Sequence, residues 1–184
     1  MSITPTLDSK IAASLHYLFR KNKLVTNTQF LVNTGRENEI CGNVVGPVAK
    51  YLPMRFAGIN NKDFAEYADR FDIEYKLLLS FREGYYYWPY TSNKIFIGYE
   101  WIPSSELVQE ERIDKFQQIS HEYLVDIKLT VEEKQGGVSI LWQYDESKYP
   151  VLHIQSLHSQ LCNLIRELDE TSSQITSEVT IRGD

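Results

Sequence analysis

The stretch that decides the fold is residues 121–144, HEYLVDIKLTVEEKQGGVSILWQY. Its first part carries an apolar side chain at every second position, which is the period of a strand with one buried face: Tyr123, Val125, Ile127, Leu129 and Val131. Residues 134–137, Lys-Gln-Gly-Gly, have the composition of a tight turn, and the alternation resumes after them at Val138, Ile140, Trp142 and Tyr144. The stretch therefore predicts two half-buried strands joined as an antiparallel hairpin.

Three other stretches have the apolar spacing of about 3.6 residues that marks one buried face of a helix. The first begins at a cap on Asp8 or Ser9 and ends near Lys23, the second runs from Asn61 or Asp63 to about Arg82, and the third begins at Pro150. Their apolar positions are Ile11, Leu15, Leu18 and Phe19, then Phe64, Tyr67, Ala68, Phe71, Tyr75, Leu78 and Leu79, and finally Val151, Ile154, Leu157, Leu161, Leu164, Ile165 and Leu168.

β-branched and aromatic residues predict further strands at residues 26–32 and 94–101, and a shorter strand within 48–56. Pro53 cannot donate to a strand ladder, so the short strand belongs at a sheet edge or a bulge. Residues 104–118 form either a long surface connection or a short helix. The order helix, strand, strand, helix, strand, hairpin, helix predicts an α/β fold (an α+β sandwich), in which helices pack on a mixed sheet.

The chain has 184 residues and a formal net charge of −6, which fits one globular domain. We assign residues 8–169 to that domain, 1–7 to an N-terminal extension and 170–184, rich in Ser and Thr, to a disordered tail. The acidic balance argues against nucleic-acid binding, because no cluster of Lys and Arg is denser than residues 20–23. No stretch is apolar enough to cross a membrane and no signal peptide is evident, so we expect a cytoplasmic protein.

The cysteines and histidines do not form a recognisable metal or catalytic motif. Cys41 and Cys162 lie in no Cys-x-x-Cys pair, and we expect two buried thiols rather than a disulfide or zinc site. His153 and His158 are five residues apart on one helix and diverge by about 140°. We expect His16 to be solvated and His121 to be a surface or capping residue.

Read in order, these landmarks resemble the C-terminal half of a nonribosomal peptide synthetase condensation domain, in the chloramphenicol-acetyltransferase-like superfamily. Three segments carry the resemblance: a helix and a strand that ends in Gly35-Arg36, the segment Gly46-Pro47 to Arg55, and the closing hairpin and helix. The family often has Gly-Pro followed by Leu-Pro-Leu-Arg, where this chain reads Leu-Pro-Met-Arg at 52–55. Ala49-Lys50 stand where the family has an Asn, and residues 85–90 only loosely resemble its Gln-Asp-Tyr-Pro-Phe-Glu motif.

The resemblance implies one lobe of a two-lobed acyltransferase, whose tunnel receives phosphopantetheine-tethered substrates from carrier proteins. The chain itself binds no cofactor in this interpretation. The family's catalytic His-His-x-x-x-Asp-Gly motif belongs to the other half, and none of the four histidines here fits it. We therefore assign no catalytic residue and no metal ligand, and we expect the chain to be inactive alone. The positions that match family motifs or suit a tunnel or interface are Arg36, Gly46, Pro47, Pro53, Arg55, Tyr87 and Trp88.

These positions also have simpler interpretations. Gly46-Pro47 is either a sharp turn or a place where backbone approaches a tethered substrate, and Arg55 suits an ion pair inside the lobe better than a channel. The aromatic residues 85–90 are either a loop packed over the sheet or an interface. Three hypotheses remain: a condensation lobe paired with an N-terminal half or with a second copy, a free-standing module that binds a carrier protein or another biosynthetic partner, and an independent small transferase.

Overall fold

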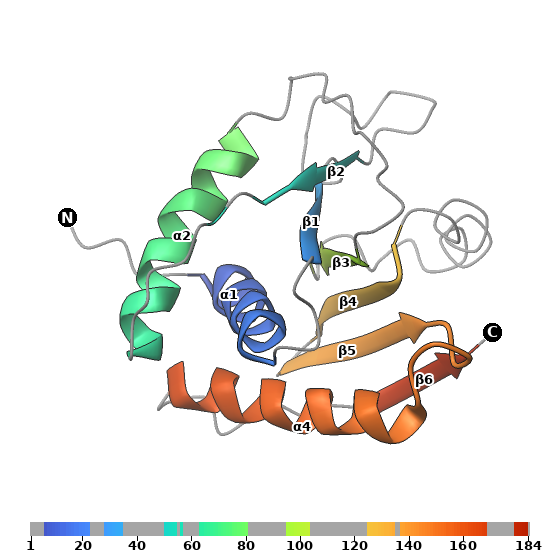
Figure 1. The fold of residues 1–184 in the computed structure, drawn as a ribbon. Coiled ribbons are helices and arrows are strands. Elements are labelled where there is room, and N and C mark those ends of the chain that lie inside the picture. Colours follow the sequence, from blue (N-terminus) through green and yellow to red (C-terminus); the bar gives the residue numbers. More distant parts are fainter. Residues whose placement is uncertain are drawn as a thin grey trace.

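The protein is a layer of helices packed on one face of a mixed β-sheet. The structure, a computed structural model, describes residues 6–22, 28–34, 50–54, 56, 63–80, 95–103, 125–134, 137–168 and 179–183. The elements are α1 (Leu7–Lys21), β1 (Thr28–Thr34), β2 (Lys50–Pro53), α2 (Phe64–Ser80), β3 (Ile95–Ile102), β4 (Ile127–Lys134), β5 (Gly137–Tyr144), α4 (Val151–Leu168) and β6 (Val179–Gly183). Helix α1 lies between α2 and α4 and contacts both (Figure 1). The predicted α/β fold is confirmed.

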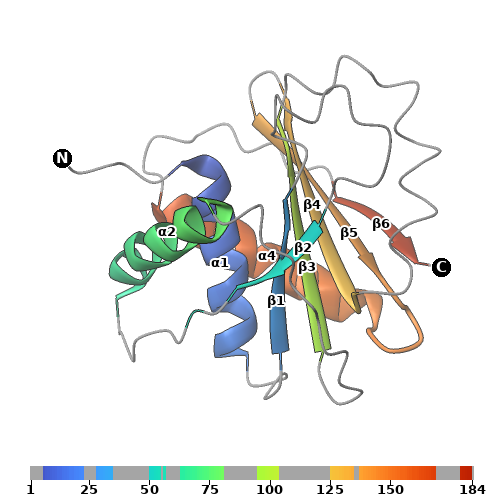
Figure 2. The same cartoon turned by 90° about the horizontal axis from the view of Figure 1, so that it is seen from above.

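The sheet has six strands in the order β2-β1-β3-β4-β5-β6. Strands β1, β3 and β4 run parallel, while β2 is antiparallel to β1, and β5 to β4. Figure 2 views β1, β3 and β4 nearly edge-on, with α1 and α2 on one side of them. The predicted hairpin is confirmed, because Ile127 pairs with Tyr144 at one end and Lys134 with Gly137 at the other.

The start of each helix follows from a local hydrogen bond or from proline. Thr6 caps α1, since its hydroxyl accepts a hydrogen bond from the Ser9 amide at 3.3 Å, so the cap lies two to three residues earlier than we predicted. Asp63 caps α2 as predicted, through a 2.9 Å hydrogen bond from the Ala65 amide. Helix α4 follows Pro150, whose carbonyl accepts from the His153 amide.

The prediction for the edge strand at Pro53 is confirmed, whereas the prediction for the C-terminal residues needs correction. Pro53 ends β2, which is an edge strand, so its missing amide hydrogen costs no ladder bond. At the other edge, residues 179–183 of the predicted disordered tail instead form β6, which runs parallel to β5, and residues 170–178 lie outside the described residues. The β-branched Val179, Thr180 and Ile181 favour this strand, although Ser and Thr dominate the residues before it.

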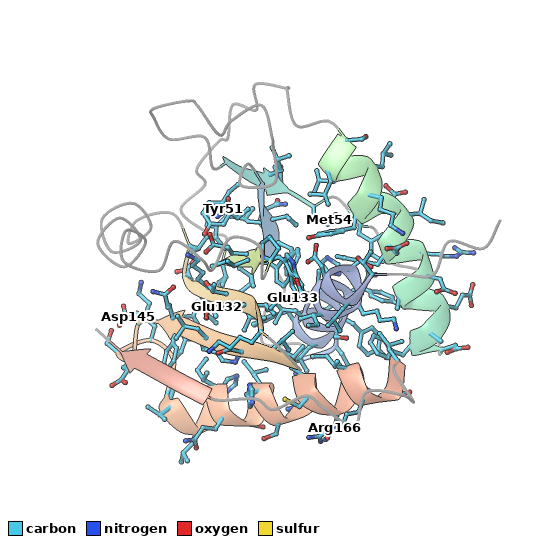
Figure 3. The ribbon with its side chains drawn as sticks, turned by 180° about the vertical axis from the view of Figure 1, so that it is seen from behind. Tyr51, Met54, Glu132, Glu133, Asp145 and Arg166 are labelled. Atoms are coloured by element: carbon cyan, nitrogen blue, oxygen red, sulfur yellow. The ribbon has the colours of Figure 1, made fainter. Side chains whose placement is uncertain are left out.

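The core lies between the helices and the face of the sheet that they cover, which we call the helix-covered face. Alternate residues of each central strand point into it, and Leu129, Ile140 and Trp142 are fully buried there. From the helices, Ile11, Phe71 and Ile154 are equally buried. Met54, just after β2, lies toward α2, whereas Tyr51 lies on the other side of β1 (Figure 3).

Candidate functional site

Most of the sequence-predicted site lies outside the described residues. This applies to Arg36, Gly46, Pro47, Arg55, Tyr87 and Trp88, and also to Cys41 and His121. Pro53 alone is described, at the end of the edge strand β2, where it pairs with Leu31 of β1. How these positions lie relative to one another is therefore outside the described residues, and the candidate site is sought among the buried and half-buried polar groups that are described.

The most polar buried cluster lies on the sheet face away from the helices, which we call the opposite face. The Glu100 carboxylate of β3 forms a 2.6 Å ion pair with Lys128 Nζ of β4, and their side chains are 1% and 5% exposed. Asn33 Nδ2 of β1 donates to Glu100 Oε1 at 2.8 Å, and Thr130 Oγ1 donates to Glu100 Oε2 at 3.3 Å. Side chains of the two neighbouring parallel strands, β1 and β4, thus hold the carboxylate of β3.

The strand register explains this cluster. Glu100 pairs with Thr130 across β3 and β4, and Val32 pairs with Tyr99, which places the next residue, Asn33, beside Glu100. We predicted a half-buried strand within residues 121–132, and the burial is wrong for the described part of it, because Lys128 and Thr130 on its polar side are also buried. The alternating pattern identified the apolar face, but it gave no sign that the polar positions meet a carboxylate from the neighbouring strand.

The opposite face is close-packed beside the ion pair. A methyl group at Gly98 would come within 3.1 Å and 3.3 Å of the Val125 side chain, and within 3.4 Å of the Tyr51 ring. The Glu100 carboxylate is held by a cation and two neutral donors, which leaves it neither a strong base nor a free nucleophile. The cluster is therefore a buried ion pair with hydrogen bonds that link β1, β3 and β4.

The second polar group is His16, which we expected to be solvated and which is half-buried among aromatic rings. Its ring centroid lies 5.2 Å from that of Phe30 and 5.3 Å from that of Phe71. Burial, with the nearby Arg20 charge, lowers the pKa of His16 to about 4. The prediction failed because α1 is covered on two sides, by α2 and by α4, so its buried face is wider than the stripe Ile11, Leu15, Leu18 and Phe19.

A hydrogen bond fixes the orientation of His16. Its Nδ1 lies 2.6 Å from the Tyr67 hydroxyl of α2, and the Arg20 guanidinium also hydrogen-bonds that hydroxyl. Arg20 can only donate, so the hydroxyl accepts from Arg20 and keeps its own proton for donation to His16 Nδ1. In that arrangement the neutral imidazole carries its proton on Nε2. A general base performs best with a pKa near the working pH, so His16 suits packing rather than proton transfer.

The third group, His158 with Cys162, superficially resembles a nucleophile and its base. His158 Nε2 lies 3.4 Å from the Cys162 sulfur, and His158 Nδ1 accepts a 3.2 Å hydrogen bond from Trp142 Nε1. Indole nitrogen only donates, so Nδ1 must be unprotonated and Nε2 carries the proton toward the sulfur. His158 therefore cannot remove the Cys162 proton. Burial also lowers the pKa of His158, which makes it a weaker base. The group ties α4 to β5.

The remaining buried polar contacts join α1 to α2 and to β3. The Asp8 carboxylate accepts hydrogen bonds from the hydroxyls of Tyr75, at 3.0 Å, and Tyr99, at 2.7 Å. The Ser9 hydroxyl donates to Asp72, which also pairs with Lys76 at 2.6 Å. Asp8 and Ser9 lie in the first turn of α1, where a carboxylate also faces the positive end of the helix dipole.

The described residues show neither a metal-binding group nor a membrane-spanning helix, and comparison with known proteins assigns no family. Within the described parts of the chain, His, Cys, Asp and Glu nowhere gather in a group that could hold a metal ion. Across those same parts, no helix is both long and apolar enough to span a membrane. No family model matches the chain, and no curated protein matches it either.

Proposed function

We propose that the chain is the C-terminal lobe of a condensation-type acyltransferase, which supplies one wall of a substrate tunnel while a partner supplies the catalytic histidine. The proposal rests on the resemblance of three ordered segments to the condensation domain of nonribosomal peptide synthetases. The substrates would be acyl and aminoacyl groups carried as phosphopantetheine thioesters. The partner histidine would take a proton from the acceptor amine, or position that amine, as it attacks the donor thioester.

The observation that carries the proposal is the order of the elements. A helix and strand, the Gly-Pro segment leading into the edge strand β2, a second helix, a central strand and the closing hairpin and helix follow in that order. Pro53, within the Leu-Pro-Met-Arg match, sits at an edge where its missing donor is tolerated.

The chemistry of the described residues is compatible with a supporting lobe. Nδ1 of His16, both ring nitrogens of His158 and both carboxylate oxygens of Glu100 contact neighbouring side chains. These groups stabilise the lobe. The catalytic group of the proposed reaction is therefore expected from outside these 184 residues, in agreement with the missing His-His-x-x-x-Asp-Gly motif.

A reconstitution tests the proposal. The purified chain is mixed with a separately expressed N-terminal condensation half from the same cells that bears the His-His-x-x-x-Asp-Gly motif, together with loaded donor and acceptor carrier proteins. We expect amide product, measured by mass spectrometry, only when both halves are present. Carrier binding without amide formation would contradict the lobe assignment and favour a docking module. Neither binding nor product would contradict both.

Arg55→Ala is the variant that sharpens the test, and Arg166→Ala is its matched control, because Arg166 is exposed on α4. We expect Arg55→Ala to lower the rate of amide formation at least about tenfold, equivalent to about 1.4 kcal/mol in the barrier. Arg166→Ala should leave the rate unchanged. Equal effects of the two variants would contradict a contribution of Arg55 to amide formation. Circular dichroism of each variant identifies any loss of folding.

A further inference from the structure

The outward face of α2 carries two exposed apolar side chains. Ile73 is 65% exposed and Leu77 is 49% exposed, although both are large and hydrophobic. They are four residues apart, so they lie within about 40° of each other around the helix. Helix α2 lies at the outer margin of the helix layer, with α1 on its inner side (Figures 1 and 2). This pair, which we call the Ile73 patch, faces away from the core.

Charges flank the Ile73 patch in a regular way. At about 100° per residue, Arg70 and Glu74 lie on one side of the patch and Asp69 and Lys76 lie on the other. Each side therefore carries one positive and one negative residue, separated by one or two helical turns. A surface with this arrangement can be complementary to itself when it is turned around.

We propose that the Ile73 patch docks a second copy of this chain, with the two α2 helices antiparallel across a two-fold axis at Ile73. In this packing Ile73 meets its own counterpart. On one side Arg70 comes within about 3 Å of axial register with Glu74 of the other copy, and on the other side Asp69 does so with Lys76. Antiparallel helix dipoles also attract.

The ion pairs that Arg70 and Lys76 form within the chain leave both residues able to pair with a second copy. Arg70 pairs with Glu66 at 3.4 Å, and both side chains are about half exposed, so that pair contributes little and can rearrange. Lys76 pairs with the buried Asp72 and is itself 36% exposed, so its ammonium can contact a second carboxylate. One helix face is small beside the roughly 1,200–2,000 Å² that stable interfaces bury, so the dimer should dissociate on dilution. The inference is independent of the proposed acyl-transfer role.

A charge-swap experiment tests the pairing. Arg70→Glu alone and Glu74→Arg alone each place two like-charge contacts in the proposed homodimer. When the two variants are mixed, the carboxylate introduced in one chain faces the guanidinium introduced in the other, and the second contact keeps its native Arg70 and Glu74. Sedimentation velocity over about a hundredfold range of concentration should show dimer for the unmodified chain and for the mixture, and at least tenfold weaker association for each single variant.

The same experiment can overturn the proposal. A monomer at every concentration, or a dimer that neither single variant weakens, would exclude this surface. Weaker association of the single variants without recovery of the dimer in the mixture would also overturn it. A parallel packing would place Arg70 against Asp69, so mixing the two variants would not restore the dimer. Far-ultraviolet circular dichroism checks that the exposed substitutions leave the fold intact.

Cross-linking gives an independent measurement. In a Cys41→Ser background, Ile73→Cys should form a disulfide-linked dimer under mild oxidation, because the two positions meet at the axis. Leu152→Cys is the control: this side chain is 79% exposed on α4, far from the patch in sequence. Dimer formation at equal rates from both positions would indicate random collision and would contradict docking at α2.

Discussion

The two faces of the sheet are both buried at β3 and β4, but they are held by different interactions. On the helix-covered face, Ile97 of β3 and Leu129 and Val131 of β4 are fully buried among other apolar groups. On the opposite face, the same strands bury Glu100, Lys128 and Thr130 as a hydrogen-bonded cluster. The first face gains stability from area removed from water, which tolerates small shifts. The second depends on charges whose partners must lie at fixed positions.

This difference indicates which substitutions should destabilise the protein most. An apolar side chain that loses a neighbour loses part of its contact area, whereas a buried carboxylate that loses its ammonium keeps an uncompensated charge. The ion pair also joins β3 to β4, which are parallel and have long connections between them, so it helps to select the register of that pairing.

The largest effect is expected from Lys128→Met. This change leaves the Glu100 carboxylate buried without its cation, and we expect the free energy of unfolding to fall by about 3–5 kcal/mol. The double variant Lys128→Met with Glu100→Gln should recover more than half of the loss, because the neutral amide keeps an acceptor for Asn33. Urea unfolding followed by circular dichroism measures both. A single-variant loss under about 1 kcal/mol would contradict the buried ion pair.

The next effect concerns pH and the helix-covered face. The pKa of His16 in the folded protein is about 4, below its ordinary value of 6.5, so the unfolded chain binds more protons between these pH values. Stability should therefore fall as the pH is lowered from about 6.5 to 4, by on the order of 3 kcal/mol. The lowered pKa of His158 adds a contribution of the same sign.

His16→Phe is the variant that isolates this pH effect. Phenylalanine fits the aromatic surroundings and cannot take up a proton, so the dependence of stability on pH should be much shallower than in the unmodified protein. Urea midpoints measured at several pH values provide the comparison. An unchanged slope in His16→Phe would show that another group controls the acid sensitivity.

A smaller effect is expected where α4 meets β5. His158→Phe removes the acceptor of the buried Trp142 Nε1 and should cost about 1–3 kcal/mol. Trp142→Phe removes the donor, and the double variant should show a coupling of about 1 kcal/mol in a double-mutant cycle. Additive losses would mean that the hydrogen bond contributes nothing beyond packing.

The smallest effect is expected at Gly98 on the opposite face. Gly98→Ala adds a methyl group 3.1 Å from the Val125 side chain, and we expect a loss of about 1 kcal/mol from overpacking. Adding Val125→Ala should remove the crowding, so Gly98→Ala should cost less in that background than in the unmodified chain. An equal cost in both backgrounds would place the strain elsewhere.

The sequence predicted the parts of the fold that depend on local patterns. The alternation around residues 134–137 located the β4–β5 hairpin, and Pro150 located the start of α4. The parallel pairing of β1 with β3 and of β3 with β4 joins segments far apart in the chain, and local periodicity carries no information about it. Strand β6 was missed because a short β-branched segment gains its pairing only from β5.

The candidate site was less accessible to prediction. Glu100, Lys128 and Asn33 come from three strands, and their meeting depends on a register that only the folded sheet supplies. His16 was expected in solvent because its neighbours were counted on one helix face, while α2 adds a second covered side. The signal that could have indicated the cluster was Glu100 itself, a single carboxylate within an otherwise apolar strand.

Affinity isolation of the tagged chain from its native cells tests most directly whether this chain acts as a lobe with a partner that bears the catalytic histidine. Mass spectrometry would then identify the proteins that remain bound at near-equal amounts. We expect a chain that carries His-His-x-x-x-Asp-Gly. Recovery of carrier proteins without such a chain, or of this chain alone, would contradict it.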